Sequence, residues 1–129
     1  MIPRYRAWNK NLKTMYEVDD IMSIDFGKSE ISVKTLFFER TNYYNFNDIV
    51  LMQSTGLIDK TGKEIFEGDI LGTEDGLLNG VVNFNTDLGM WTNSLIRYNN
   101  FERLCNIADS REIIGNIYSN PELLEVKDS

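Results

Sequence analysis

The sequence predicts a mainly β protein. Three observations support this fold class. Val, Ile, Phe and Tyr are frequent, turn residues recur at short intervals, and several segments alternate apolar and polar residues with a period of two. The chain has 129 residues, of which 42% are hydrophobic. This length is enough to bury a core in one domain or in two small β modules.

The first part of the chain is expected to form two hairpins. Residues 8–12 separate a strand at 5–7 from a second strand at 15–18. In the next hairpin, the alternating segments 22–26 and 31–34 flank a glycine-containing turn. Since side chains in a strand point to opposite faces in turn, one face of this hairpin is expected to be apolar and the other hydrated.

Residues 39–48 interrupt the alternation and are predicted to be a linker. The short apolar run at 49–52 follows, which is consistent with a buried strand. We therefore divide the chain into an N-terminal β-hairpin subdomain with its linker, residues 1–48, and a C-terminal subdomain, residues 49–129.

Turn signals punctuate the second half more clearly. Residues 59–62 end in glycine, as many tight turns do, and residues 67–69 combine a glycine with an aspartate. Asn79–Gly80 lies between two apolar pairs, which is a strong signal for a two-residue hairpin turn.

Two short helices are expected near the C-terminus. Apolar residues in 101–108 have helical spacing, although residues 95–110 leave strand and helix open. A second helix is expected at 121–125, where Asn120 would be the N-cap and Pro121 the first helical residue.

Three segments resemble proteins of the YopX family, which phages and prophages encode. They are residues 5–8, 51–70 and 113–124, which occur in the family's order. The resemblance implies a β-rich N-terminal part followed by a small SH3-like β-barrel. It also implies a phage or prophage origin, and hence a bacterial host cytoplasm. It implies no activity and no catalytic residues.

Charge is unevenly distributed. The net charge is −7; residues 1–64 carry nine basic and nine acidic side chains, whereas residues 65–129 carry four and eleven. The acidic half would repel a phosphate backbone, so nucleic acid is an unexpected partner for it. The chain begins without the apolar segment of a signal peptide and has one cysteine. A cytoplasmic location without membrane contact is expected.

The residue types argue against the common catalytic sites. The chain has no histidine, so Ser-His-Asp and Cys-His catalysis are excluded. Cys105 is expected to be a small core residue. Glu64, Glu67 and Asp69 cluster around a turn, where turn chemistry and solubility explain them better than a metal does. Residues 56–63 depart from the spacing of a phosphate-binding loop. We expect no enzymatic activity, no cofactor and no metal.

One basic segment is a candidate contact for nucleic acid or another partner. Its cations precede the first acidic residue, Glu17, and are interleaved with aromatic residues that could stack on single-stranded bases. An ordinary edge hairpin explains the pattern as well. The candidate residues are Arg4, Tyr5, Arg6, Trp8, Lys10 and Lys13.

A second candidate is an aromatic segment spaced by asparagines: Tyr43, Tyr44 and Phe46. Aromatic residues are enriched at protein interfaces, although packing between the two halves would also explain them. Two functions follow from these candidates. The first is a non-catalytic module that binds a host or phage protein, or a second copy of itself. The alternative is a nucleic-acid-binding accessory protein that uses the basic N-terminal hairpin.

Overall fold

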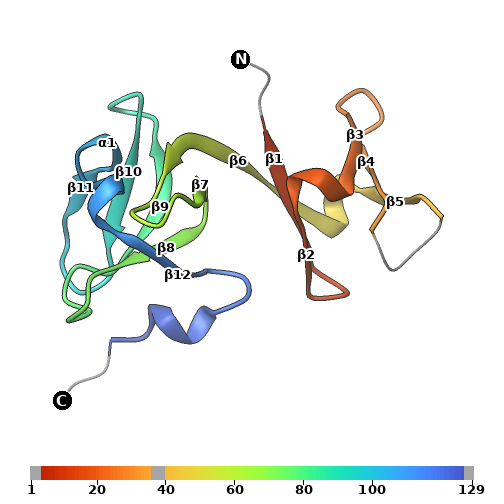
Figure 1. Ribbon diagram of the computed structural model, residues 1–129. Coiled ribbons are helices and arrows are strands. Elements are labelled where there is room, and N and C mark those ends of the chain that lie inside the picture. The colour runs from red at the N-terminus through yellow and green to blue at the C-terminus, as the bar shows by residue number, and fades with distance from the viewer. Residues whose placement is uncertain (1–3, 36–39, 127–129) are drawn as a thin grey trace. The chain divides into compact units, whose positions relative to one another are not determined.

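The computed structural model describes residues 4–35 and 40–126, which fold into two compact units. Unit 1 is Met1–Gln53 and unit 2 is Ser54–Ser129 (Figure 1). The division falls within a long strand, whereas the sequence analysis places it at 48/49. In the described residues, no helix is long and apolar enough to span a membrane.

Unit 1 consists of two small antiparallel sheets. Strands β1 (Tyr5–Asn9) and β2 (Thr14–Tyr16) form the first predicted hairpin, and β1 also pairs with the start of β6 (Ile49–Ile58). The second sheet has the order β3-β4-β5. Its strands and the two short 3₁₀ helices of the unit are η1 (Val18–Asp20), β3 (Ile21–Asp25), β4 (Glu30–Val33), β5 (Asn42–Asn45) and η2 (Phe46–Asp48).

The core of unit 1 lies between these two sheets. Its buried members are Ala7, Tyr16, Ile31, Val33 and Ile49. Strand β4 contributes the alternate residues Ile31 and Val33, as the period of two predicts.

A β-bulge changes the face that β3 presents to this core. The register shifts between Ile21 and Ser23, so Ile21 and Ile24 pack against the core while Met22 is 61% exposed. The hairpin itself is confirmed, but the simple alternation over 22–26 is wrong. The bulge inserts one extra residue, which offsets the pattern.

The segment predicted as a linker is part of unit 1. Residues 42–45 form β5, which pairs with β4 along its whole length, and residues 46–48 form η2. Tyr44 points into the core and Tyr43 does not, so the segment alternates after all. Asparagines in place of the usual polar strand residues hide this alternation in the sequence.

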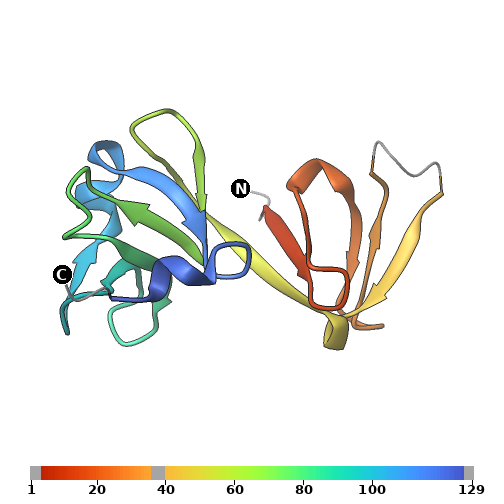
Figure 2. The ribbon, with the colours of Figure 1, turned by 90° about the horizontal axis from the view of Figure 1, so that it is seen from below.

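Unit 2 is built on a five-stranded antiparallel sheet, order β11-β10-β9-β8-β12, which curls into a half-barrel (Figure 2). The end of β6 pairs with β7 beside it. The elements are β7 (Glu64–Phe66), β8 (Asp69–Gly72), β9 (Gly80–Asn85), β10 (Met90–Leu95), β11 (Phe101–Arg103), α1 (Leu104–Ile107), η3 (Ala108–Ser110), β12 (Glu112–Asn116) and η4 (Pro121–Leu124). The mainly β fold class with short C-terminal helices is confirmed.

The core of unit 2 is closed by α1. Leu104 and Ala108 are buried with three strand residues, Ile65, Leu71 and Val82. The expected helix over 101–108 begins only at Leu104, because the preceding residues pair with β10 as β11. The prediction that Cys105 fills the core is wrong, since the thiol lies on the exposed side of this short helix.

Two predicted turns of unit 2 are confirmed and one is not. Gly62 and Gly68 have φ angles of 89° and 87°, which glycine adopts at little cost. Asn79–Gly80 is not a two-residue hairpin turn. Residues 73–79 connect β8 to β9, and Gly80 is the first residue of β9.

Asp59 anchors the turn between β6 and β7 to β12. It is 3% exposed. Its Oδ1 accepts hydrogen bonds from the N–H groups of Thr61 and Lys63, both at 2.9 Å, and from the Thr61 hydroxyl at 2.7 Å. Its Oδ2 accepts the N–H of Ile113 at 3.0 Å. Burial alone would raise the pKa of Asp59, but these hydrogen bonds outweigh it and lower the pKa to about 2.

We expect Asp59→Asn to destabilise the protein by about 2 kcal/mol at neutral pH, because the amide places a donor against a backbone N–H. The folded-state pKa is below the unfolded value, so the carboxylate stabilises the fold above about pH 4. That stabilisation is lost as the pH falls from about 4 to about 2. Urea unfolding of the native protein and of the Asp59→Asn variant at several pH values measures the difference in stability. The two stabilities should converge near pH 2, and a constant difference would contradict the assignment. Asp87→Asn, in an exposed turn, is the control.

Candidate functional site

The basic N-terminal segment lies on β1 and the turn that follows it. Ala7 points into the core, so Arg6 and Trp8 share the opposite face of the strand. Both are buried, whereas Arg4, Lys10 and Lys13 are exposed and Tyr5 is half-buried. The Lys10 ammonium donates a hydrogen bond to the Asn47 carbonyl at 3.1 Å. The hairpin thus brings the predicted cations together in one element, with different exposures.

The aromatic candidates on β5 and η2 do not form one loop. Tyr44 stacks on Tyr16 with ring centroids 5.6 Å apart, inside the core. Burial, with the contact to Tyr44, raises the pKa of Tyr16 to about 12. Phe46 packs against the same core, and Tyr43 alone is 64% exposed. Of the three candidates, Tyr43 is therefore the one that is well placed to contact a partner.

Two exposed apolar residues in the same sheet as Tyr43, or in its first turn, were missed by sequence reasoning. Met22 and Phe26, on β3 and its turn, are 61% and 64% exposed. The Phe26 ring also meets Phe46 edge-on, with centroids 5.8 Å apart. We call Met22, Phe26 and Tyr43 the apolar set of unit 1. Alternation alone could not have found Met22 and Phe26, because it assigns both to the buried face.

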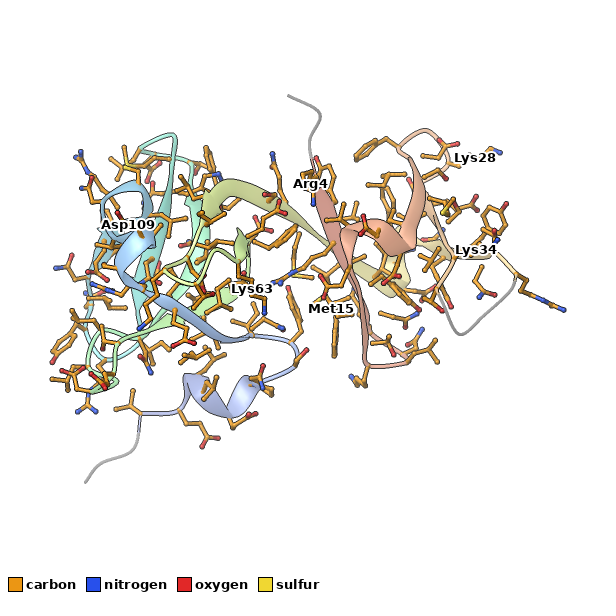
Figure 3. The ribbon with its side chains drawn as sticks, in the orientation of Figure 1. Arg4, Met15, Lys28, Lys34, Lys63 and Asp109 are labelled. Atoms are coloured by element: carbon orange, nitrogen blue, oxygen red, sulfur yellow. The ribbon has the colours of Figure 1, made fainter. Side chains whose placement is uncertain are left out.

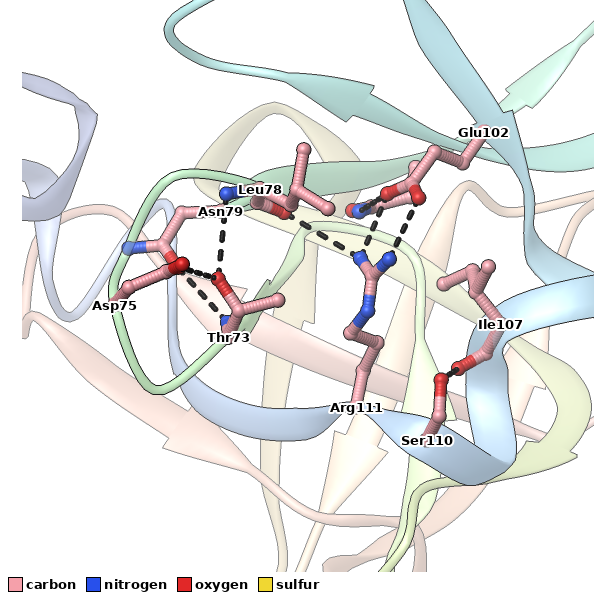
Figure 4. Close-up of polar contacts among 9 residues, drawn as sticks. Thr73, Asp75, Leu78, Asn79, Glu102, Ile107, Ser110 and Arg111 are labelled. Carbon is pink, nitrogen blue, oxygen red and sulfur yellow. Dashed lines mark hydrogen bonds and ion pairs between the residues drawn. The ribbon is translucent and has the colours of Figure 1, made fainter.

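A partly buried ion pair joins β11 to the residue that precedes β12, near α1 (Figure 4). The Arg111 guanidinium donates to both carboxylate oxygens of Glu102, at 2.7 and 2.6 Å. The Asn93 amide donates to the same carboxylate at 3.2 Å. The hydrogen bond from Arg111 is the main cause that lowers the pKa of Glu102. The two charges satisfy one another, which accounts for both side chains by their contacts within the fold.

Asn93 also explains why Gly80 is a glycine. Asn93 is fully buried, and its amide lies flat against Gly80. A Cβ at position 80 would be 2.5 Å from Asn93 Oδ1. The Asn-Gly sequence therefore reflects a close approach between β9 and β10.

The other residues that were considered as metal ligands or as a phosphate-binding loop belong to strands and turns of the described residues. Within 4–35 and 40–126, no three His, Cys, Asp or Glu side chains could together hold a metal ion. Asp69 Oδ2 accepts the Phe66 N–H at 2.7 Å, which is turn chemistry. Burial raises the pKa of Glu67. The residues that resemble a phosphate-binding loop form the end of β6 and the turn anchored by Asp59.

We expect Gly80→Ala to destabilise the protein by about 1–3 kcal/mol, because the added methyl group collides with the Asn93 amide. The double variant with Asn93→Ala should recover part of the loss, as measured by a double-mutant cycle in urea. Gly89→Ala is the matched control. Its cost arises from a φ of 66°, with no neighbour within 4 Å, so Asn93→Ala should not rescue it. Equal rescue of both would contradict the steric explanation.

Comparison with known proteins covers nearly the whole chain. Protein EF1440 from Enterococcus faecalis has a solved structure that is similar with a TM-score of 0.66 and 31% identity, over 97% of this chain and 99% of that one. The structure of yopX from Bacillus subtilis is similar in fold, with a TM-score of 0.61 and 21% identity over 95% and 98% of the two chains. No curated protein matches. The family described as YopX protein matches residues 4–125, and the chain therefore belongs to the YopX family.

Proposed function

We propose that this protein is a phage or prophage accessory protein that acts in the bacterial host cytoplasm. In this proposal it is a non-catalytic module that binds a host or phage protein. Its place in the YopX family supports the proposed origin, since the sequence resembles proteins that phages and prophages encode.

The apolar set of unit 1 is the observation that carries this function. Met22, Phe26 and Tyr43 are each more than 60% exposed, and all three belong to the β3-β4-β5 sheet or its first turn. Large apolar side chains that are this exposed within one small sheet favour contact with another protein. Tyr, Phe and Met are also among the residues enriched in protein interfaces.

The charge distribution favours a protein partner at unit 1. Residues 1–53 carry seven basic and seven acidic side chains, whereas residues 54–129 carry six and thirteen. Unit 1 is thus neutral and unit 2 supplies the whole net charge of −7. A neutral apolar surface can be desolvated at low cost, and the acidic unit keeps the protein soluble.

Photo-crosslinking tests this proposal. A photoreactive phenylalanine at position 26 should form an adduct with a host or phage protein in infected or uninfected cells. The matched control places the same group at Tyr98, an exposed aromatic residue of unit 2. Excess unmodified protein should compete for the adduct, and Phe26→Ser protein should compete at least about tenfold less well. Equal crosslinking at both positions, or none at either, would contradict the proposal.

Nucleic-acid binding by the N-terminal hairpin is the second candidate, since β1 and its turn gather Arg4, Arg6, Lys10 and Lys13. We expect at most micromolar affinity. Because Arg6 is buried, the exposed cations Arg4, Lys10 and Lys13 would make the phosphate contacts. Three contacts would give a slope of roughly −3 for log K against log salt. Reversing the exposed Arg4 and Lys13 to Glu should abolish the binding in a fluorescence anisotropy titration, while reversing Lys28 and Lys34 should not. Nanomolar binding that persists at high salt would favour this function over the first.

A further inference from the structure

We infer that β5 is a self-association edge. Two copies of the chain would join their β5 strands antiparallel, about a two-fold axis at Tyr43. The β3-β4-β5 sheet of one copy would then continue into that of the other.

Alternate residues of β5 form backbone hydrogen bonds to β4, and this alternation decides which N–H and C=O groups lie on the outer edge of β5. The Phe46 N–H donates to the Ser29 carbonyl at 2.9 Å, which makes 46 and 29 a hydrogen-bonded pair. Hydrogen-bonded pairs occur at every second residue of an antiparallel ladder, so Tyr44 and Asn42 also bond to β4. The N–H and C=O of Tyr43 therefore point away from β4, and no strand in the described part of the chain pairs with them.

The other sheet edges of the described residues are protected, and β5 is not. Edge strands β2, β7 and β11 have three residues each, while β3 and β12 contain register shifts. Short length and bulges both discourage pairing with another chain. Strand β5 has four residues in unbroken register with β4 and contains no charge and no proline. The cations Lys28 and Lys34 lie at the two ends of β4 instead (Figure 3).

A second copy fits this edge better than an unrelated strand because the pairing is self-complementary. With Tyr43 opposite Tyr43 of the other copy, the two residues exchange both N–H···O bonds. Directly opposed residues share a face, so the two exposed rings would meet on the outer face of the joined sheet. Beside them, the Ser32 and Ser23 hydroxyls already satisfy one another.

The net charge of unit 1 allows a second copy to bind there. Two copies of unit 1 meet without net repulsion because each has seven basic and seven acidic residues. The contact is small compared with the roughly 1,200–2,000 Å² of a stable interface, so the dimer should be weak. We expect a dissociation constant on the order of 0.1–1 mM, which favours a dimer mainly where the local concentration is high.

This inference shares one sheet with the proposed function but does not depend on a host or phage partner. It uses the backbone edge of β5, whereas the crosslinking test uses Phe26. A chain that dimerises without an adduct at position 26 supports the dimer and contradicts the proposed function. An adduct at position 26 together with a chain that stays monomeric contradicts the dimer alone.

Sedimentation equilibrium of the full chain, from about 10 µM to about 1 mM, tests the dimer. The weight-average mass of the native protein should rise with concentration. Tyr43→Pro removes the outward N–H together with the ring, which an edge strand tolerates, and should weaken association at least about tenfold. Tyr43→Val keeps the N–H and the strand propensity, and should still dimerise. Phe26→Ser should dimerise like the native protein.

A further variant covers the case in which Tyr43→Pro fails to fold by circular dichroism. Tyr43→Lys keeps the N–H but sets two like charges opposite one another, so its association should weaken at low salt and recover at high salt. A native protein that stays monomeric over the whole range would overturn the inference. Dimers that survive both Tyr43→Pro and Tyr43→Lys would also overturn it, because they must form through another surface.

Discussion

The carboxylate of Asp59 joins segments of unit 2 that lie far apart in the sequence. One oxygen organises the β6–β7 turn, and the other accepts a backbone N–H from β12, which is 54 residues away along the chain. A buried charge is tolerated only when its hydrogen-bonding capacity is filled, and here four donors fill it. This contact favours one register of β12, because a slip of that strand would leave the buried Oδ2 of Asp59 without its hydrogen bond.

The need to satisfy buried backbone groups explains why the segments that resemble the YopX family contain polar residues without a recognisable catalytic pattern. Residues 51–70 contain Asp59 and its turn, together with the Asp69 carboxylate that accepts the Phe66 N–H. Residues 113–124 contain the receiving strand, and there Asn120 Oδ1 accepts the Asn116 N–H instead of capping η4. These polar residues satisfy backbone groups of the fold. The exposed apolar set of unit 1 lies outside both segments. In this chain, the resemblance therefore reports the fold, and the proposed binding surface has to be argued from exposure and charge.

The sequence predicted those turns and hairpins whose conformation depends only on residues close together in the chain. Turns at Gly62 and Gly68 were predictable because a positive φ favours glycine. The hairpins over 5–18 and 22–34 were predictable because a turn segment separates two strand-like segments in each. The wrong predictions arise where a residue that is distant in the sequence determines the local structure. Gly80 serves the packing of Asn93 on the neighbouring strand, so its Asn-Gly sequence misleads as a turn signal. Likewise the extra residue at Met22 and the pairing of β5 with β4 depend on partners that no short window contains.

The same reasoning separates the aromatic residues of the candidate site. In sequence, Tyr43, Tyr44 and Phe46 form one polar-aromatic segment whose role is ambiguous between core and interface. Pairing with β4 resolves the ambiguity residue by residue, because a strand must send neighbouring side chains to opposite faces. Tyr44 is then needed for the stack on Tyr16, and Tyr43 is left outside it. A surface tyrosine on an uncharged edge strand therefore follows from how the core is built, and the same constraint that buries Tyr44 supplies the residue and the backbone groups with which a second chain could pair.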